Sequence, residues 1–189
     1  MQKIHLKRTK RINDGHLWVF SNELYENPKK YASGSIVELY DMKDAFIGTG
    51  YINPQSLISV RILTRDREPV DKEFFSRRIK DALTLREKLL GSRDAMRLIY
   101  SEGDFLPGLI ADKYKNCLVL QFLTAGMEAM KETVINLFDE MLMPEVIILR
   151  NDGRSRTLEG LSLHKEIVKG NLDTLPVINE DGILFEINP

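Results

Sequence analysis

Ser35-Ile-Val-Glu-Leu-Tyr40 alternates apolar and polar residues, and two similar segments follow it closely, Ala45-Phe-Ile-Gly-Thr-Gly-Tyr-Ile52 and Leu57-Ile-Ser-Val-Arg-Ile-Leu63. Turn-forming residues, Asp41 to Asp44 and then Asn53-Pro54, separate the three segments. Gly48 and Gly50 lie inside the middle segment, where glycine usually marks a bulge or a tight bend. Short strands at this spacing, with no helix between them, predict a small barrel or sandwich.

The clearest helix of the chain is expected from Lys72 to Leu90, after a linker at residues 65–69. Asp71 is a good N-cap, and apolar residues recur on one broad face of the helix. Gly91 is placed to end the helix. A shorter helix is expected at residues 7–13, because Gly15 provides a stop. We place the domain boundary at the linker.

The residues after the long helix predict a mixed domain. Strands are expected at residues 97–100, 109–114, 117–122 and 145–149, with one helix at residues 125–141. The Asp181-Gly182 pair favours a hairpin between residues 176 and 187, since both positions tolerate positive φ. The predicted fold class is therefore α+β, with a small β-barrel at residues 1–68, an α+β domain at 70–175 and a hairpin at 176–189.

Composition sets broad limits on the chain. It has 189 residues, of which 43% are hydrophobic, so it can bury one large or two small cores. Cys117 is the only cysteine, which excludes a disulfide framework and fits a reducing compartment. No apolar run approaches the ~20 residues that cross a bilayer, and no signal segment is visible. We expect a soluble, cytoplasmic protein.

Motifs for catalysis are sparse. The sequence has no GxGxxG, GxxxxGK[ST] or GxSxG pattern, and its three histidines have no metal-ligand spacing. Cys117 begins a strand pattern and is expected to be a packed thiol rather than a nucleophile. Glu102 and Asp104 could form an acid and base pair, but their Gly- and Pro-containing surroundings favour an ordinary loop. No catalytic, cofactor-binding or metal-binding residue is predicted.

Two basic segments remain as candidates for binding. The N-terminal basic segment, residues 7–11, leads into Trp18 and Phe20, and the second basic segment covers residues 150–156. Cations beside aromatic rings suit RNA, although both segments could be ordinary solvated surface. Trp18 and Phe20 are expected to be core anchors, because most aromatic side chains are buried. The candidate RNA contacts are Lys7, Arg8, Lys10, Arg11, His16, Arg61, Arg150, Arg154 and Arg156.

Several motifs carry a resemblance to a known family. They are Gly15-His-Leu-Trp-Val-Phe-Ser-Asn22, Gly34-Ser-Ile-Val-Glu-Leu-Tyr-Asp41, Gly48-Thr-Gly-Tyr-Ile-Asn-Pro54, Glu102-Gly-Asp-Phe-Leu-Pro-Gly-Leu-Ile110 and Gln121-Phe-Leu-Thr-Ala-Gly-Met127. In this order they resemble the PUA domain and middle domain of the large-subunit rRNA methyltransferase I family. The similarity covers essentially the whole chain.

The resemblance implies a three-part enzyme. In that family a PUA barrel and a middle domain precede a Rossmann-like class I methyltransferase domain. That domain uses S-adenosylmethionine and a catalytic cysteine to methylate carbon 5 of a cytosine in 23S rRNA. The resemblance places the cofactor loop and the catalytic cysteine beyond Pro189, so Cys117 does not inherit that role. We therefore expect a truncated chain that alone is inactive and binds no cofactor.

The expected partners are ribosomal RNA and the missing catalytic domain, with no membrane. Homo-oligomerisation is left open. Two alternatives also remain open at this point. One is a stand-alone RNA-binding PUA protein without enzymatic activity. The other is a role without RNA, because PUA domains also resemble parts of a few metabolic kinases.

Overall fold

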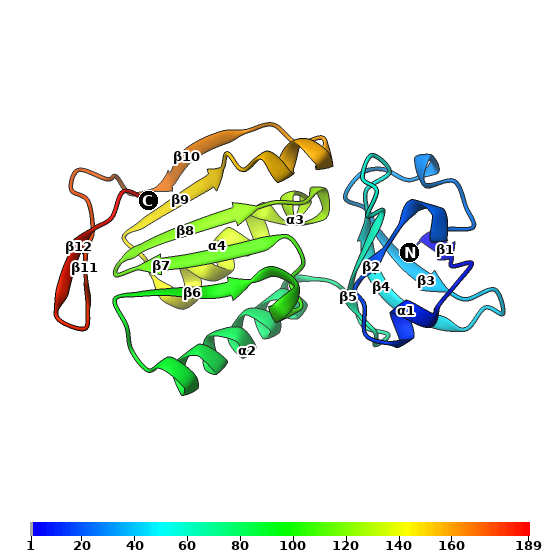
Figure 1. Ribbon diagram of the computed structural model, residues 1–189, viewed down its shortest axis with the longest axis horizontal. Coiled ribbons are helices and arrows are strands. Elements are labelled where there is room, and N and C mark those ends of the chain that lie inside the picture. The colour runs from blue at the N-terminus through cyan, green and yellow to red at the C-terminus, as the bar shows by residue number, and fades with distance from the viewer. Residues whose placement is uncertain (1) are drawn as a thin grey trace.

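The computed structural model describes residues 2–189, which form two five-stranded sheets and a separate two-stranded hairpin (Figure 1). The first sheet has the order β1-β3-β4-β5-β2. Its strands are β1 (Gln2–His5), β2 (Trp18–Val19), β3 (Ile36–Tyr40), β4 (Phe46–Ile52) and β5 (Val60–Thr64). Short helices decorate it: α1 (Lys10–Asn13) and the 3-10 turns η1 (Ser21–Glu23) and η2 (Pro28–Lys30).

The first sheet is not a closed barrel, although a small β-barrel was expected. β1 pairs as a strand with β3, in parallel, and the two-residue β2 pairs with β5. The chain that follows η1 contacts the end of β1 through an isolated antiparallel bridge between Leu6 and Leu24 and through the amide of Tyr25, which donates to the carbonyl of His5 at 2.8 Å. Inward-facing residues of β1, β3, β4 and β5 nevertheless share one core, which includes Ile4, Val37, Leu39, Ile52 and Ile62.

The second sheet has the order β10-β9-β8-β7-β6; in Figure 1, α4 lies behind it and α2 runs along its β6 edge. Its strands are β6 (Ala95–Tyr100), β7 (Leu109–Tyr114), β8 (Cys117–Phe122), β9 (Val146–Asn151) and β10 (His164–Lys169). The helices are α2 (Lys72–Leu90), α3 (Ala125–Ala129) and α4 (Lys131–Leu142), and the 3-10 turns are η3 (Ser101–Asp104) and η4 (Arg154–Glu159). None of the helices formed by residues 2–189 has both the length and the apolar character needed to cross a bilayer.

The helices of the second half agree with the sequence in one case and differ in another. The Asp71 carboxylate accepts a hydrogen bond from the amide of Phe74 at 3.0 Å, and Gly91 ends α2 with φ of 66°. The single helix expected at residues 125–141 is wrong, because it is divided into α3 and α4. Met130, with φ of −97° and ψ of 6°, ends the first helix and caps the second.

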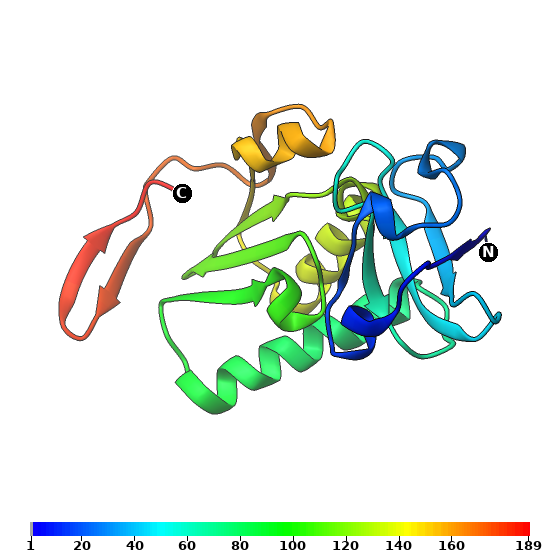
Figure 2. The same ribbon diagram turned by 45° about the vertical axis from the view of Figure 1, so that its right-hand side comes forward.

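The hairpin consists of β11 (Val177–Glu180) and β12 (Ile183–Glu186), and it stands apart from the rest of the molecule in Figure 2. Asp181 and Gly182 form its turn with φ of 50° and 91°. Contact with the second sheet is limited: Ile178 is buried, and the amide of Asn179 donates to Asp94 at 2.9 Å. Every residue of β12 is exposed.

The two sheets meet at a packed joint. Tyr51 of β4 inserts its ring against Gly126, where any side chain would collide with it. The hydroxyl of Tyr51 donates to the carbonyl of Pro107 at 2.9 Å and lies 2.8 Å from the Thr124 hydroxyl. Tyr51 and Leu63 therefore belong to the core of the second sheet. The joint fixes which residues of the two halves face each other.

Candidate nucleic-acid interface

A hollow of about 610 Å³ lies beside the N-terminal basic segment, and we call it the basic hollow. Lys7, Arg8 and Arg11 line it together with Phe20 and Leu57. Lys7 and Arg8 are exposed because the chain has just left β1 and has not yet entered α1. The hollow therefore combines exposed positive charge with an aromatic wall, the combination that suits phosphate and base together.

Arg11 is held more firmly than Lys7 and Arg8. Its guanidinium donates to both carboxylate oxygens of Glu23, at 3.1 and 3.2 Å, and lies 4.9 Å from the centre of the Phe20 ring. Glu23 also accepts from the amide of Phe20 at 2.8 Å. Arg11 therefore fixes the wall of the hollow, and because Glu23 neutralises its charge, it attracts a phosphate less strongly than Lys7 or Arg8. Lys10 is exposed on α1.

His16 is exposed next to the same segment, and a cation that sequence reasoning missed lies beside it. The guanidinium of Arg65 donates to the carbonyl of Ile12 at 2.6 Å and to that of His16 at 3.4 Å. No local pattern indicates these hydrogen bonds, since Arg65 is 49 positions from His16 and sits in the expected linker.

The candidate RNA contact Arg61 is largely buried in the structure. It is 8% exposed, and its guanidinium lies 2.8 Å from a carboxylate oxygen of the buried Glu159. The side-chain amide of Asn53 donates to the same carboxylate at 2.8 Å. Burial raises the pKa of Glu159, but the charge of Arg61 and these hydrogen bonds outweigh it and lower the pKa below its usual value. Arg61 thus joins the two halves of the molecule.

The candidate RNA contact Arg156 is buried as well, since it is 1% exposed. Its guanidinium donates to the carbonyl of Ser162 at 3.0 Å, to Glu128 at 2.9 Å and to the carbonyl of Phe122. These partners lie on three different segments, so the side chain ties η4 to β8 and α3. A buried, fully bonded arginine of this kind is structural.

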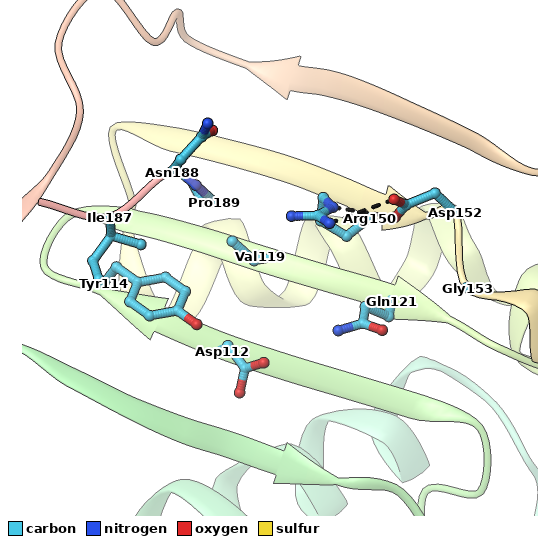
Figure 3. Close-up of a pocket in the computed structure, with 10 residues that line it drawn as sticks. All are labelled: Asp112, Tyr114, Val119, Gln121, Arg150, Asp152, Gly153, Ile187, Asn188 and Pro189. Carbon is cyan, nitrogen blue, oxygen red and sulfur yellow. Dashed lines mark hydrogen bonds and ion pairs between the residues drawn. The ribbon is translucent and has the colours of Figure 1, made fainter.

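Arg150 lies in a different hollow, of about 310 Å³, on the face of the second sheet opposite the helices (Figure 3). Asp152 accepts from its guanidinium at 3.1 Å, and Asp112 on the same face is held by Arg97 at 2.8 Å. Hydrogen bonding from Arg150 lowers the pKa of Asp152, which keeps the pair charged and satisfied. Arg154 is exposed, and no ion pair to it occurs within residues 2–189.

Trp18 is not the core anchor that was expected. It is 39% exposed, and its indole Nε1 donates to Glu102 at 2.7 Å. β2 is an edge strand, and its neighbour Val19 points into the core, so Trp18 must face outward. Phe20 is half-buried. Asp104 is bound by Arg86 at 2.7 Å and accepts from the amide of Tyr100, as expected of a structural loop.

Two remaining titratable groups have structural surroundings. Cys117 is buried, and burial raises the pKa of its thiol, so it lacks the thiolate character of a nucleophile. His5, whose neighbours the sequence did not reveal, lies 3.0 Å from Asp44 and 2.6 Å from Glu26. Hydrogen bonds to Asp44 and then Glu26 raise its pKa.

Residues 3–65, which include all strands of the first sheet from Lys3 to Thr64, match the family described as PUA-like domain. Ribosomal RNA large subunit methyltransferase I from Shewanella amazonensis is 35% identical over 98% of this chain and 48% of the relative. The protein of that name from Pseudoalteromonas translucida is 35% identical over 96% of this chain and 47% of the relative. The chain belongs to the large-subunit rRNA methyltransferase I family, and it spans about half the length of these curated relatives.

Solved structures show the same fold at low sequence identity. A methyltransferase in complex with SAH superimposes with a TM-score of 0.81 at 17% identity, over 98% of this chain and 47% of that one. A SAM-dependent methyltransferase from Streptococcus mutans gives a TM-score of 0.80 at 17% identity, over 98% and 48%. The arrangement of the two sheets therefore recurs within larger methyltransferase chains.

Proposed function

We propose that these 189 residues are the RNA-recognition part of a ribosomal RNA methyltransferase that acts on carbon 5 of a cytosine with S-adenosylmethionine as methyl donor. The names of the relatives support ribosomal RNA as the substrate and methyl transfer as the reaction, and the name of a structural neighbour supports the methyl donor. The observation that carries the role of this chain is the basic hollow, where the exposed Lys7 and Arg8 lie beside Phe20. Such a protein would work in the cytoplasm.

Charge supports RNA contact through the first sheet. Residues 1–70 contain eleven Lys or Arg against eight Asp or Glu, whereas the remaining residues contain sixteen basic and twenty acidic ones. Arg61 is largely buried, whereas Lys7 and Arg8 reach solvent at the basic hollow and Lys10 is exposed on the neighbouring α1. Phosphate neutralisation by such side chains dominates affinity for RNA and makes it depend on salt.

We propose that S-adenosylmethionine is not bound by residues 2–189. Sites for such a cofactor lie at the carboxyl ends of parallel strands, above an open glycine-rich turn. The second sheet has a single parallel pair, β8 with β9, within residues 2–189. The turn after β8, Leu123-Thr124-Ala125-Gly126, is not glycine-rich, and the space over its one glycine is filled by the ring of Tyr51. The methyl donor would therefore bind elsewhere in the intact enzyme.

We place the modules at residues 1–68, 70–175 and 176–189. The separate sheets and the position of α2 directly after residues 65–69 support the first boundary. The isolated pairing of β11 with β12 supports the second.

A salt series tests the role of the basic hollow. RNA binding by the chain, measured by filter retention at several salt concentrations, should weaken steeply as salt rises. Replacing Lys7 and Arg8 with Ala should reduce the slope of log affinity against log salt by roughly 0.7 to 0.9 for each phosphate that is no longer neutralised. The matched control replaces Lys80 and Lys88, two exposed lysines of α2, and should leave the slope unchanged. Equal slopes for both variants would contradict the proposal.

Calorimetry with S-adenosylmethionine tests the proposal that this chain does not bind the methyl donor. We expect the 189-residue chain to show no binding, because it lacks a cofactor cradle. Stoichiometric binding in the micromolar range would show that the cofactor site is misplaced.

A further inference from the structure

A second hollow of about 540 Å³ opens between the two sheets, and we call it the interdomain cleft. Its walls carry large apolar side chains from both halves. Leu57 and Ile58 precede β5, whereas Leu123 follows β8 and Leu158 lies in η4. Leu57 is 79% exposed and Leu158 is 76% exposed. Large apolar side chains on both walls of one cleft, open to solvent, mark a binding surface rather than a core.

The interdomain cleft is continuous with the basic hollow. Phe20 and Leu57 line both of them, so these two side chains form a shared wall. On one side of that wall are Lys7 and Arg8, and on the other is an apolar space. A ligand that fits both must therefore join an anionic group to a flat or apolar group over a short distance.

The polar groups of the cleft divide into those already bonded and those still available. Glu159 is neutralised by Arg61, and Glu102 accepts from Trp18 and from Ser101. In contrast, no hydrogen bond involving the side-chain amide of Gln55 or the hydroxyl of Ser155 is found within residues 2–189. An amide offers both donors and an acceptor to the edge of a base.

The position of Gln55 depends on the backbone opposite it. Gly160 has φ of 74°, and a side chain there would collide with the Gln55 amide. The walls themselves are fixed by Tyr51 against Gly126 and by the Arg61 to Glu159 ion pair. The cleft is therefore preformed, which lowers the entropy cost of binding.

We propose that the interdomain cleft takes the base of one unpaired RNA nucleotide, while a neighbouring phosphate lies in the basic hollow. This inference rests on the proposed function, since it assumes that the ligand is RNA. A paired base is excluded from such a cleft because duplex RNA keeps its bases stacked inside the helix, whereas unpaired bases can turn outward onto apolar and aromatic side chains.

The test uses the full chain and short single-stranded RNA, with a set of oligonucleotides that each lack one base. Removing the base that enters the cleft should weaken binding at least about fivefold, the lower end of what one stacked base contributes. Removing bases at the ends should have little effect. In the Leu57→Glu variant, the intact oligonucleotide and the one that lacks this base should bind with equal affinity. Leu57 is exposed, so the fold should be unaffected.

Leu89→Glu is the matched control, because Leu89 is 72% exposed on α2 and lines neither hollow. It should bind every oligonucleotide like the unmodified protein. Two failures can be distinguished. Absence of salt-dependent binding by all proteins would overturn the proposed function. Salt-dependent binding in which no abasic position matters, or in which Leu57→Glu behaves like Leu89→Glu, would overturn the base site alone. A preference for duplex RNA over single strands would do the same.

Discussion

Arg8 and Arg156 have the same side chain and lie in the two basic segments of the chain, yet their surroundings are opposite. Arg8 reaches solvent beside the basic hollow. Arg156 is enclosed and donates to Ser162, Glu128 and Phe122. An arginine can bind phosphate only when its donors are free, as those of Arg8 are toward solvent, whereas burial with three partners makes the same group of Arg156 a structural link.

The largest effect should come from Arg156. Arg156→Met should lower the free energy of unfolding by about 3 kcal/mol, because the buried carbonyl of Phe122 then loses its donor and Glu128 keeps only its ion pair with Lys131. Urea unfolding measures this. Arg154→Ala is the control two positions away, and its exposed side chain predicts a change within about 0.5 kcal/mol. Equal effects at the two positions would remove the contrast between buried and exposed arginines.

The second largest loss of unfolding free energy should come from substituting Arg61, and this loss should depend on pH. In the native protein the pKa of Glu159 is lowered, so its contribution to stability is present above the unfolded pKa and lost as pH falls. Arg61→Met leaves Glu159 buried without a counter-charge and should cost about 2 to 3 kcal/mol at pH 7. The variant should lose less when the pH is lowered toward 5, because the carboxyl can then accept a proton. Urea titrations at both values check the sign.

Substituting the exposed Arg8, together with Lys7, should affect RNA binding and not the stability of the fold. Lys7→Ala with Arg8→Ala should change the unfolding free energy by less than about 0.5 kcal/mol. RNA affinity at low salt should nevertheless fall by roughly tenfold, as expected when two phosphates are no longer neutralised. Arg150→Ala with Arg154→Ala, measured in the same filter assay, should fall much less, because Arg150 is paired with Asp152. The reverse order would make the second basic segment the RNA site.

The smallest effect on stability should come from substituting His5, a partly exposed residue near the same end of the chain. Its pKa is raised by Asp44 and Glu26, so its contribution is complete below the unfolded pKa and disappears as pH rises through the folded one. His5→Gln should therefore destabilise the chain more at pH 5.5 than at pH 8. A difference of the opposite sign in thermal unfolding would show that the two carboxylates do not stabilise the protonated ring.

Local signals in the sequence predicted local structure well. Asp71 and Gly91 bound α2 as expected, because a cap depends only on residues within one turn. The edge strands β1 and β10 were missed, since each is rich in charged or polar residues and resembles a loop. The sequence alone did not distinguish exposed candidate arginines from buried ones. The partner of Arg61 is 98 positions away, and nothing near Arg61 indicates that Glu159 will bury it.

The ring of Tyr51 occupies the space above Gly126, so the first sheet cannot swing away without opening the core of the second. Unfolding of either half should then expose apolar surface belonging to the other. Calorimetry should accordingly record one heat-absorption peak for the whole chain, with equal calorimetric and van't Hoff enthalpies, in place of two successive transitions.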